Sequence, residues 1–275
     1  MILETKKICN RLRDDIVALA GRKSPLLCCV GFSEDGSTLS YFRSIERAAN
    51  KTKIRVRKEI LKDISVHDTV SFMETLNRDG DINGIVISRP IPLPLQKAGI
   101  KNIIDPAKDV DCITDENLGG LITGNVLYTP PTPGAVMEII KEFNIETTGR
   151  NVVVLGRSDV VGKPLALLLL RKGVDATVTV CHSKTRYLIS LTRTADILIT
   201  AVGRPQFLKC NMVKPGTIVI DVGINVKDGR VVGDVDFEDV KRVAGMITPT
   251  PGGVGPVTTH ILLLNVAKAA KRKAD

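Results

Sequence analysis

A glycine loop behind a short apolar run is the first stretch of this sequence that suggests chemistry. Residues 152–155 read VVVL, and Gly156, Arg157, Ser158 and, four residues later, Gly162 follow. In a dinucleotide-binding unit the first glycine permits the tight turn and the last lets a helix approach its strand. Ser158 stands where the usual middle glycine would be, and its hydroxyl and N–H can bind a phosphate at a helix N-terminus. An ordinary strand–glycine–helix turn looks the same, so the loop alone leaves both interpretations open.

The turn after the next expected strand distinguishes between two cofactors. Residues 181–186 read CHSKTR, with no carboxylate among them. An NAD-binding unit places an acidic residue here to hold the ribose hydroxyls. Ser183, Lys184 and Arg186, together with Arg157, would instead attract a 2′-phosphate. The sequence therefore predicts NADP, and the alternative is a solvated basic turn.

Other chemistries find little support in the composition. The chain has 275 residues, a net charge of +9 and only nine aromatic residues, none of them Trp. Residues 1–125 carry a charge of +2 and residues 126–275 carry +7, which fits a polyanionic small molecule better than nucleic acid. The three histidines are scattered and no two cysteines have C-x-x-C spacing, so we expect no metal and buried free thiols. The N-terminus is too charged for a signal peptide or membrane span, which predicts a soluble, cytoplasmic protein.

Alternating strands and helices must position these residues. We expect helices at 4–20, 40–50 and 66–76 and strands at 26–32, 54–60 and 84–87, followed by an irregular RPIPLP segment at 89–94. After a second proline cluster at 129–134 we expect a helix at 135–143, strands at 152–155, 176–180, 196–201 and 217–220, helices at 163–171 and 186–194, and a hairpin region at 228–235. The pattern predicts an α/β fold of two domains with parallel sheets, changing near 126–150. The last helix follows a glycine- and proline-rich loop, after the second sheet is complete, and is predicted to return to the first domain.

Six motifs, in order along nearly the whole chain, resemble one family. KDVD (108–111), PPTP (130–133), GRSDVVGKP (156–164), CHSKT (181–185), DVGIN (221–225) and TPTPGGVGPVT (248–258) are similar to those of the methylenetetrahydrofolate dehydrogenase/cyclohydrolase family of the bacterial FolD type. GRS followed by CHSKT is typical of its NADP-using members. The resemblance implies a folate-binding catalytic domain at 1–126 with 254–275 and a Rossmann-like NADP domain at 127–253. It also implies a homodimer, and no nucleic-acid or membrane partner.

The resemblance also implies a reaction. 5,10-Methylenetetrahydrofolate would pass a hydride to NADP⁺, and the methenyl product would be hydrolysed to 10-formyltetrahydrofolate. Asp111 would bind the pterin, Tyr41 would line its pocket, and Ser88 would belong to the catalytic set. Further substrate contacts would come from Pro251, Gly252, Gly253 and Thr258. The cofactor would be held by Gly156, Arg157, Ser158, Ser183 and Ile224.

Each of these assignments has a simpler structural alternative. Tyr41 can be an aromatic residue at a helix start, Asp111 the cap of a turn, and PGGVGP at 251–256 a tight connection. For the whole chain, the alternatives are an NADP-linked dehydrogenase of a shikimate-like acid or a non-catalytic nucleotide-binding protein.

Two positions depart from the family together. The family motif Tyr-x-x-x-Lys reads Tyr41 to Ile45 here, and the glutamine before the proline loop is replaced by Ser88, with Arg89 next. Hydride transfer depends mainly on positioning, whereas hydrolysis requires proton transfer. The sequence therefore predicts that the dehydrogenase activity persists and that the cyclohydrolase step is slow.

Overall fold

The computed structural model describes residues 1–21, 24–62 and 65–273, and the chain forms two compact units. Unit 1 contains residues 1–9 and 132–258, and unit 2 contains residues 10–131 and 259–275. Two parallel sheets, one in each unit, confirm the predicted two-domain α/β class. The predicted domain limits stay a prediction, and residues 274–275 of the first domain lie outside the described residues.

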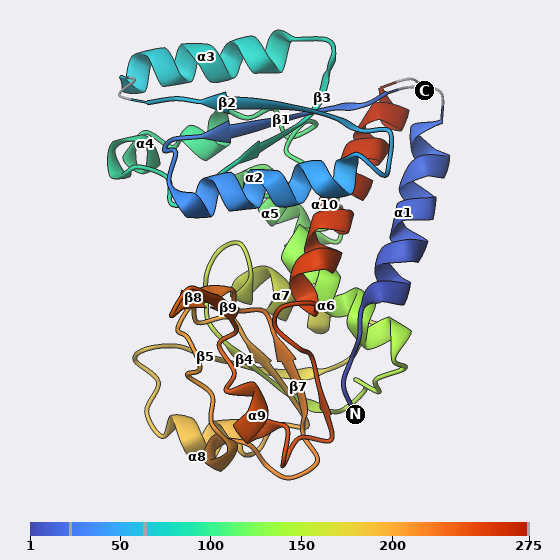
Figure 1. The fold of residues 1–275 in the computed structure, drawn as a ribbon, viewed down its shortest axis with the longest axis vertical. Helices are drawn as coiled ribbons and strands as arrows, with labels where there is room; N and C mark the ends of the chain where they lie inside the picture. Colours follow the sequence, from blue (N-terminus) through green and yellow to red (C-terminus); the bar gives the residue numbers. More distant parts are fainter. Residues whose placement is uncertain (22–23, 63–64, 274–275) are drawn as a thin grey trace. The chain divides into compact units, whose positions relative to one another are not determined.

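Unit 2 is built on a three-stranded parallel sheet in the order β2-β1-β3. Its strands are β1 (Leu26–Gly31), β2 (Arg55–Ile60) and β3 (Ile82–Ile87), close to the predicted ranges. Helices α2 (Gly36–Ala49) and α3 (Val66–Arg78) connect the strands and lie on opposite faces of the sheet (Figure 1). Two parallel strands can be joined only by a long crossover connection, and here a helix forms each crossover. The alternation of strand and helix along the sequence therefore favours a parallel sheet.

The main core of unit 2 lies on the α2 face of this sheet. Side chains alternate along a strand, and Leu27 and Cys29 of β1 both join this core. Helix α10 (Val254–Arg272) contributes its C-terminal part to the same cluster, and the Asn265 amide donates hydrogen bonds to the carbonyls of Val110 (2.9 Å) and Thr129 (2.8 Å). The α2 and α10 residues in the cluster are Phe42, Ile45, Ala49, Leu262, Leu263, Val266, Ala267 and Ala269.

The other helices of unit 2 include α5 (Asp115–Thr123), the 3₁₀ helix η1 (Ile100–Ile103) and α4 (Leu93–Lys97), and α1 (Lys6–Ala20) lies in it from residue 10 onward. Helix α2 begins four residues before the predicted start because the Asp35 carboxylate accepts hydrogen bonds from the backbone N–H groups of Ser37 (2.8 Å) and Thr38 (2.9 Å). The prediction that all of 89–94 is irregular was wrong for its last two residues, which open α4, because the first turn of a helix tolerates proline.

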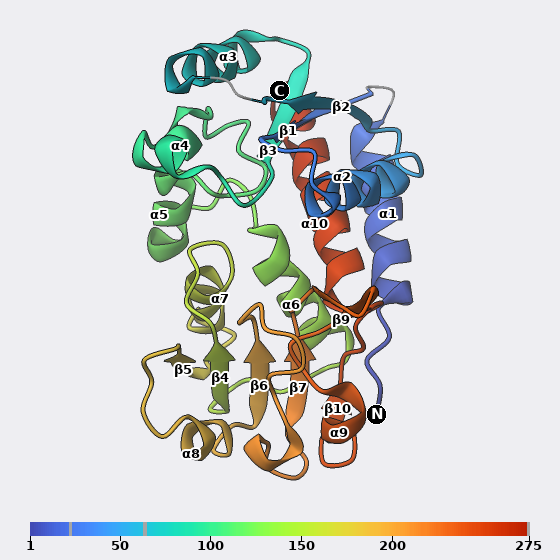
Figure 2. The same ribbon diagram turned by 60° about the vertical axis from the view of Figure 1, so that its left-hand side comes forward.

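Unit 1 contains a five-stranded parallel sheet in the order β10-β7-β6-β4-β5, and its strands β5, β4, β6 and β7 lie side by side in Figure 2. The strands are β4 (Asn151–Leu155), β5 (Thr177–Cys181), β6 (Ile197–Thr200), β7 (Ile218–Asp221) and β10 (Met246–Ile247). Strands β8 (Asn225–Lys227) and β9 (Arg230–Val232) form a separate antiparallel hairpin. The helices are α6 (Pro131–Glu142), which reaches one residue into unit 2, α7 (Gly162–Leu169), α8 (Leu188–Thr192), α9 (Phe237–Val240) and the 3₁₀ helix η2 (Cys210–Met212).

Unit 1 differs from the sequence analysis in several elements. Strand β10 and helix α9 were not predicted, and the hairpin begins at residue 225 instead of 228. Helix α6 begins at Pro131, four residues before the predicted start, so the second proline cluster forms its first turn. The first residues of the chain extend the sheet: Ile2 bridges Ile247 in parallel, and the Leu3 N–H donates to the Ile247 carbonyl at 2.8 Å.

All six cysteines are free thiols. Within residues 1–21, 24–62 and 65–273, no helix combines the length and apolar character that crossing a membrane requires.

Candidate functional site

The loop between β4 and α7 has a backbone that only glycine permits at two positions. Gly156 has φ +123°, and a Cβ there would lie 2.2 Å from the carbonyl oxygen of Ala201. A Cβ on Gly162 would lie 2.0 Å from the carbonyl oxygen of Gly156. The Ser158 hydroxyl accepts a hydrogen bond from the Val161 N–H at 3.2 Å. Its own proton stays available to donate at the start of α7. The helix itself adds few free donors there, because Pro164 has no N–H and the Lys163 N–H donates to the Ser158 carbonyl at 3.1 Å.

The basic turn after β5 lies beside this loop. Strands β4 and β5 pair with Leu155 opposite Cys181, and the Gly156 N–H donates to the Cys181 carbonyl at 2.9 Å. The Thr185 hydroxyl accepts from the His182 N–H at 2.8 Å and so holds the turn. Four residues of the loop and the turn are exposed, three with cationic side chains and one with a hydroxyl: Arg157, Lys184, Arg186 and Ser183.

Two buried aspartates tie the neighbouring loops of unit 1 together, and the sequence analysis missed both. Asp234 is fully buried and its carboxylate accepts from three consecutive N–H groups, those of Val202 (2.6 Å), Gly203 (3.0 Å) and Arg204 (2.8 Å). Asp221 lies at the end of β7, where burial raises the pKa of its carboxyl to about 6. The backbone N–H of Asp234 donates to the Asp221 carboxylate at 3.1 Å.

Two glycines are the sequence feature that could have pointed to the buried Asp221 and Asp234. Gly223 and Gly233 each stand one or two residues from an aspartate. A Cβ on Gly223 would lie 2.3 Å from the Asp234 carboxyl carbon, and one on Gly233 would lie 1.7 Å from an Asp221 oxygen. Ile224, the expected contact of the nicotinamide, follows on the same loop and is 66% exposed.

The PGGVGP segment forms the bend before α10 and, from Val254 onward, the first turn of that helix. Gly252 has φ +103°, and a Cβ on Gly253 would lie 2.4 Å from the Pro249 carbonyl oxygen. The Thr5 hydroxyl is within hydrogen-bonding distance of the Gly252 carbonyl oxygen at 2.8 Å and of the Gly253 carbonyl oxygen at 3.0 Å. Pro251 is exposed at the same bend. Thr258 follows one turn into the helix, with its hydroxyl donating to the Val254 carbonyl at 3.2 Å, and all these residues belong to unit 1.

Asp111 lies at the carboxyl edge of the unit 2 sheet. Asp109 bridges Ile85 of β3 in parallel, and the Ile85 N–H donates to the Lys108 carbonyl at 2.8 Å. Asp111 follows this bridge by two residues, in a turn, and β3 ends two residues after Ile85, where Ser88 begins the next segment. A Cβ on Gly84 would lie 2.8 Å from a Val110 methyl, so the close approach of the two segments requires glycine there.

Tyr41 and Asp111, which the sequence analysis assigned to the pterin, lie in one electrostatic environment. Both side chains are half-buried. Burial raises the pKa of Asp111 to about 7, the Asp109 charge adds to this, and the Arg89 guanidinium opposes it. Burial also raises the pKa of Tyr41 well above its usual value, and the Asp111 charge contributes. Tyr41 thus stays a neutral hydroxyl, while Asp111 titrates near neutral pH.

The two positions that depart from the family carry no ionisable group. Ile45 lies one turn after Tyr41 on α2 and is fully buried in the apolar core cluster. Ser88 is 2% exposed, and its N–H donates to the Val30 carbonyl at 2.8 Å. The cation that acts on Asp111 is Arg89, whose side chain is exposed.

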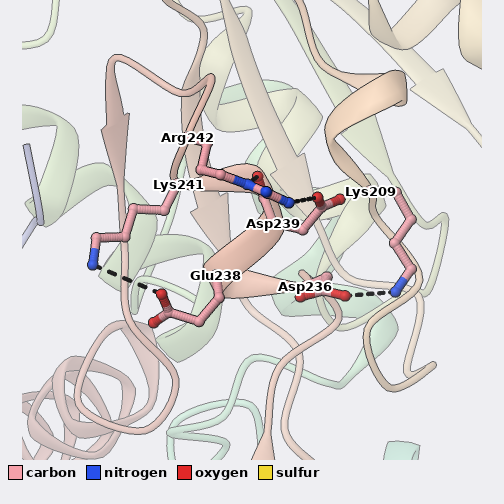
Figure 3. A pocket seen from close by; sticks show the side chains of 6 residues that line it. All are labelled: Lys209, Asp236, Glu238, Asp239, Lys241 and Arg242. Atoms are coloured by element: carbon pink, nitrogen blue, oxygen red, sulfur yellow. Dashed lines mark hydrogen bonds and ion pairs between the residues drawn. The ribbon is translucent and has the colours of Figure 1, made fainter.

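A hollow of about 860 Å³ on unit 1 is not a convincing ligand site. Six charged side chains line it, and Figure 3 shows them joined in three ion pairs. These are Lys209 with Asp236, Lys241 with Glu238, and Arg242 with Asp239. None of the expected site residues lines it. Across the part of the chain that the structure describes, no three His, Cys, Asp or Glu side chains form a group able to hold a metal.

Two family models match the chain. Residues 3–111 match the tetrahydrofolate dehydrogenase/cyclohydrolase catalytic domain, and residues 130–274 match the tetrahydrofolate dehydrogenase/cyclohydrolase NAD(P)-binding domain. The chain belongs to the tetrahydrofolate dehydrogenase/cyclohydrolase family. It is 43% identical over 278 residues to the bifunctional protein FolD of Dictyoglomus turgidum, covering 99% of this chain and 98% of that protein.

Solved structures of this family have the same fold. The bifunctional 5,10-methylenetetrahydrofolate dehydrogenase/cyclohydrolase of Thermoplasma acidophilum is 37% identical, with a TM-score of 0.91 over 100% of this chain and 99% of that one. The Trypanosoma brucei enzyme, solved with NADP cofactor and inhibitor, is 33% identical, with a TM-score of 0.92 over 100% and 98%. The shikimate alternative finds only a likeness of fold, to the Thermus thermophilus shikimate 5-dehydrogenase, at 13% identity and a TM-score of 0.53 over 91% and 98%.

Proposed function

We propose that this protein oxidises 5,10-methylenetetrahydrofolate with NADP⁺ and hydrolyses the methenyl product slowly. The family membership supports both activities. The observation that carries the second half of the proposal is the burial of Ile45 in an apolar cluster at the position of the family lysine.

The residues around the β4–α7 loop fit NADP. The loop backbone leaves no room for a Cβ at either glycine, and the Ser158 hydroxyl offers a hydrogen-bond donor for a phosphate close to the positive end of α7. Arg157, Ser183, Lys184 and Arg186 are exposed where a 2′-phosphate would be recognised. When bound, NADP⁺ supplies the hydride acceptor. Gly156, Arg157, Ser158 and Ser183 would hold it, with Ile224 near its nicotinamide.

Folate binding rests on Asp111 and Tyr41. The Asp111 carboxylate can accept two parallel N–H donors from the aminopyrimidinone of the pterin, a geometry in which charge-assisted hydrogen bonds are strong. Tyr41 keeps a neutral hydroxyl beside it and supplies an aromatic face. Pro251, Gly252, Gly253 and Thr258 would contact the substrate through backbone that approaches closely at the glycines.

Proton transfer is the step for which this site is poorly equipped. Ile45 has no ionisable group, and Ser88 is a buried hydroxyl. Arg89 supplies positive charge, but a guanidinium group does not give up its proton in proteins and so makes a poor general acid or base. Oxidation depends on the orientation of the two reactants and is less affected.

One assay tests both halves of the proposal. Methylene-folate oxidation and methenyl-folate hydrolysis are followed separately, by absorbance, with NADP⁺. We expect rapid oxidation, and methenyl-folate should accumulate during turnover. No oxidation of methylene-folate would refute the dehydrogenase assignment, and hydrolysis that keeps pace with oxidation would refute the second half.

The remaining assignments are part of the same proposal. By similarity to its family, the protein would form a homodimer and work in the cytoplasm.

A further inference from the structure

We propose that Asp109 is a positioning residue for the folate reaction, because it anchors the turn that presents Asp111 to the substrate. This inference rests on the proposed function. Asp109 is fully buried and lies two residues before Asp111, so it acts through the backbone and through its charge.

The anchor consists of four hydrogen bonds to one buried carboxylate. One oxygen accepts from the Ile113 N–H at 3.1 Å. The other accepts from the Thr114 N–H at 2.9 Å, the Thr114 hydroxyl at 2.8 Å and the Asn117 amide at 2.9 Å. Thr114 is the N-cap of α5, so Asp109 joins the start of that helix to the strand-like segment along β3. A buried carboxylate is tolerated because its hydrogen-bonding capacity is largely filled.

The residues on each side of Asp111 are also fixed. The Val110 side chain is fully buried, and its carbonyl accepts from the Asn265 amide at 2.9 Å. Cys112 has φ 55°, an uncommon conformation for a residue other than glycine, and its thiol is 3.2 Å from the Tyr128 carbonyl oxygen. Between these points the half-buried Asp111 side chain is the part of the turn that ligand can reach.

The charge of Asp109 also acts on Asp111. Burial is the largest cause of the raised pKa of Asp111, the Asp109 carboxylate is the second, and Arg89 opposes both. The other titratable side chains around Asp111 stay neutral near pH 7, because burial raises the pKa values of Tyr41, Cys29 and Cys112. If folate binds to ionised Asp111, kcat/KM falls as the pH drops through about 7. Removal of the Asp109 charge should move this acidic limb to lower pH.

Asp109→Asn tests the two effects together. The amide keeps one acceptor oxygen but turns an N–H₂ group toward at least one donor, so the turn loosens. We expect the KM for methylene-folate to rise about tenfold, the effect of one lost hydrogen bond to a charged group. We also expect the acidic limb of kcat/KM to move down by about half a pH unit or more. NADP⁺ binding, measured by fluorescence or calorimetry, should be unchanged.

Two further variants keep the test decisive. Asp115→Asn removes a nearby exposed acid and should change neither the KM nor the limb. Asn117→Ala removes one donor but leaves the Asp109 charge, so the KM should rise without a downward shift of the limb. It also provides the KM test if Asp109→Asn does not fold.

The outcomes separate this inference from the function on which it rests. Wild-type protein that does not oxidise methylene-folate refutes the function. Active wild type together with a folded Asp109→Asn variant of unchanged KM and limb refutes the role of Asp109. A rise in KM with the limb in place would show a merely structural role and would also overturn the inference, as would an Asn117→Ala variant with unchanged KM.

Discussion

Replacing Ile45 by lysine should restore the hydrolytic half of the reaction. Ile45 is one helical turn from Tyr41 and fully buried from solvent. A lysine side chain at this position must therefore extend out of the apolar cluster to reach a polar environment. A lysine stem can stay in apolar surroundings while its ammonium group extends toward polar ones. The charged side chains that act on Tyr41 include Asp111 and Arg89, so their surroundings are a polar environment for the new amine.

The magnitudes favour a measurable gain. Loss of the buried isoleucine should lower the free energy of unfolding by on the order of 2–3 kcal/mol. General acid–base catalysis is typically worth about 10²–10⁴-fold in rate. We therefore expect Ile45→Lys to speed methenyl-folate hydrolysis toward that range and to change methylene-folate oxidation by less than about tenfold. The new cation should also lower the pKa of Asp111 from about 7 and extend oxidation to lower pH.

Ile45→Met is the matched control, since it supplies a long unbranched side chain without the amine. Both steps are measured by absorbance on each variant, and urea unfolding confirms that each is folded. If folded Ile45→Lys hydrolysed methenyl-folate no faster than Ile45→Met, the missing ammonium group would not be the cause of slow hydrolysis. Wild-type hydrolysis as fast as in lysine-bearing relatives would refute the reasoning at its start and would point to Arg89 or another group.

Four other predictions concern the cofactor, Asp111, the homodimer expected from the family, and the stability of unit 2. Wild-type protein should prefer NADP⁺ over NAD⁺ by about tenfold or more in kcat/KM, and Arg157→Ala with Ser183→Ala should reduce that preference; equal use of both cofactors by the wild type would contradict it. Asp111→Ala should cripple both activities while NADP⁺ binding, measured by calorimetry, stays almost intact; normal turnover by this variant would remove Asp111 from the site. Sedimentation at micromolar concentration should give about twice the chain mass, and a strict monomer would exclude the dimer. Lys108→Met should lower the free energy of unfolding in urea by about 1.5–3 kcal/mol, because the Lys108 ammonium donates to the carbonyls of residues 76, 77 and 79 at 2.7–2.9 Å; an unchanged midpoint and slope would refute this.

Local sequence signals predicted much of the fold. Apolar runs located β1, β3, β4, β6 and β7, because a strand buried on both faces is continuously apolar, and alternation located β2. The two-residue strand β10 is too short to give such a signal and was not predicted. The early start of α2 had a local signal in Asp35, which precedes Gly-Ser-Thr and caps the helix. The bridge from Ile2 to Ile247 had none, since it joins segments from opposite ends of the chain.

The sequence predicted which residues belong to the candidate site, but it did not predict which of their side chains are buried. KDVD contains two aspartates, and nothing local shows that Asp109 is an internal anchor while Asp111 remains accessible. The difference comes from the pairing of 108–110 with β3, which turns one carboxylate toward α5 and leaves the other at the sheet edge. The same limit applies to Asp234, whose three N–H partners lie about 30 residues earlier.

The division of the chain between the two units has a consequence for biosynthesis. Each unit combines an early and a late segment: residues 1–9 with 132–258, and residues 10–131 with 259–275. The core cluster of unit 2 includes residues 262–269, so its sheet, although made first, lacks part of its apolar cover until nearly the whole chain has been synthesised. Contacts so distant in sequence slow folding and leave apolar surface exposed meanwhile. We therefore expect this protein to depend most on chaperones during synthesis, after the first half of the chain has left the ribosome and before residues 262–269 have been made.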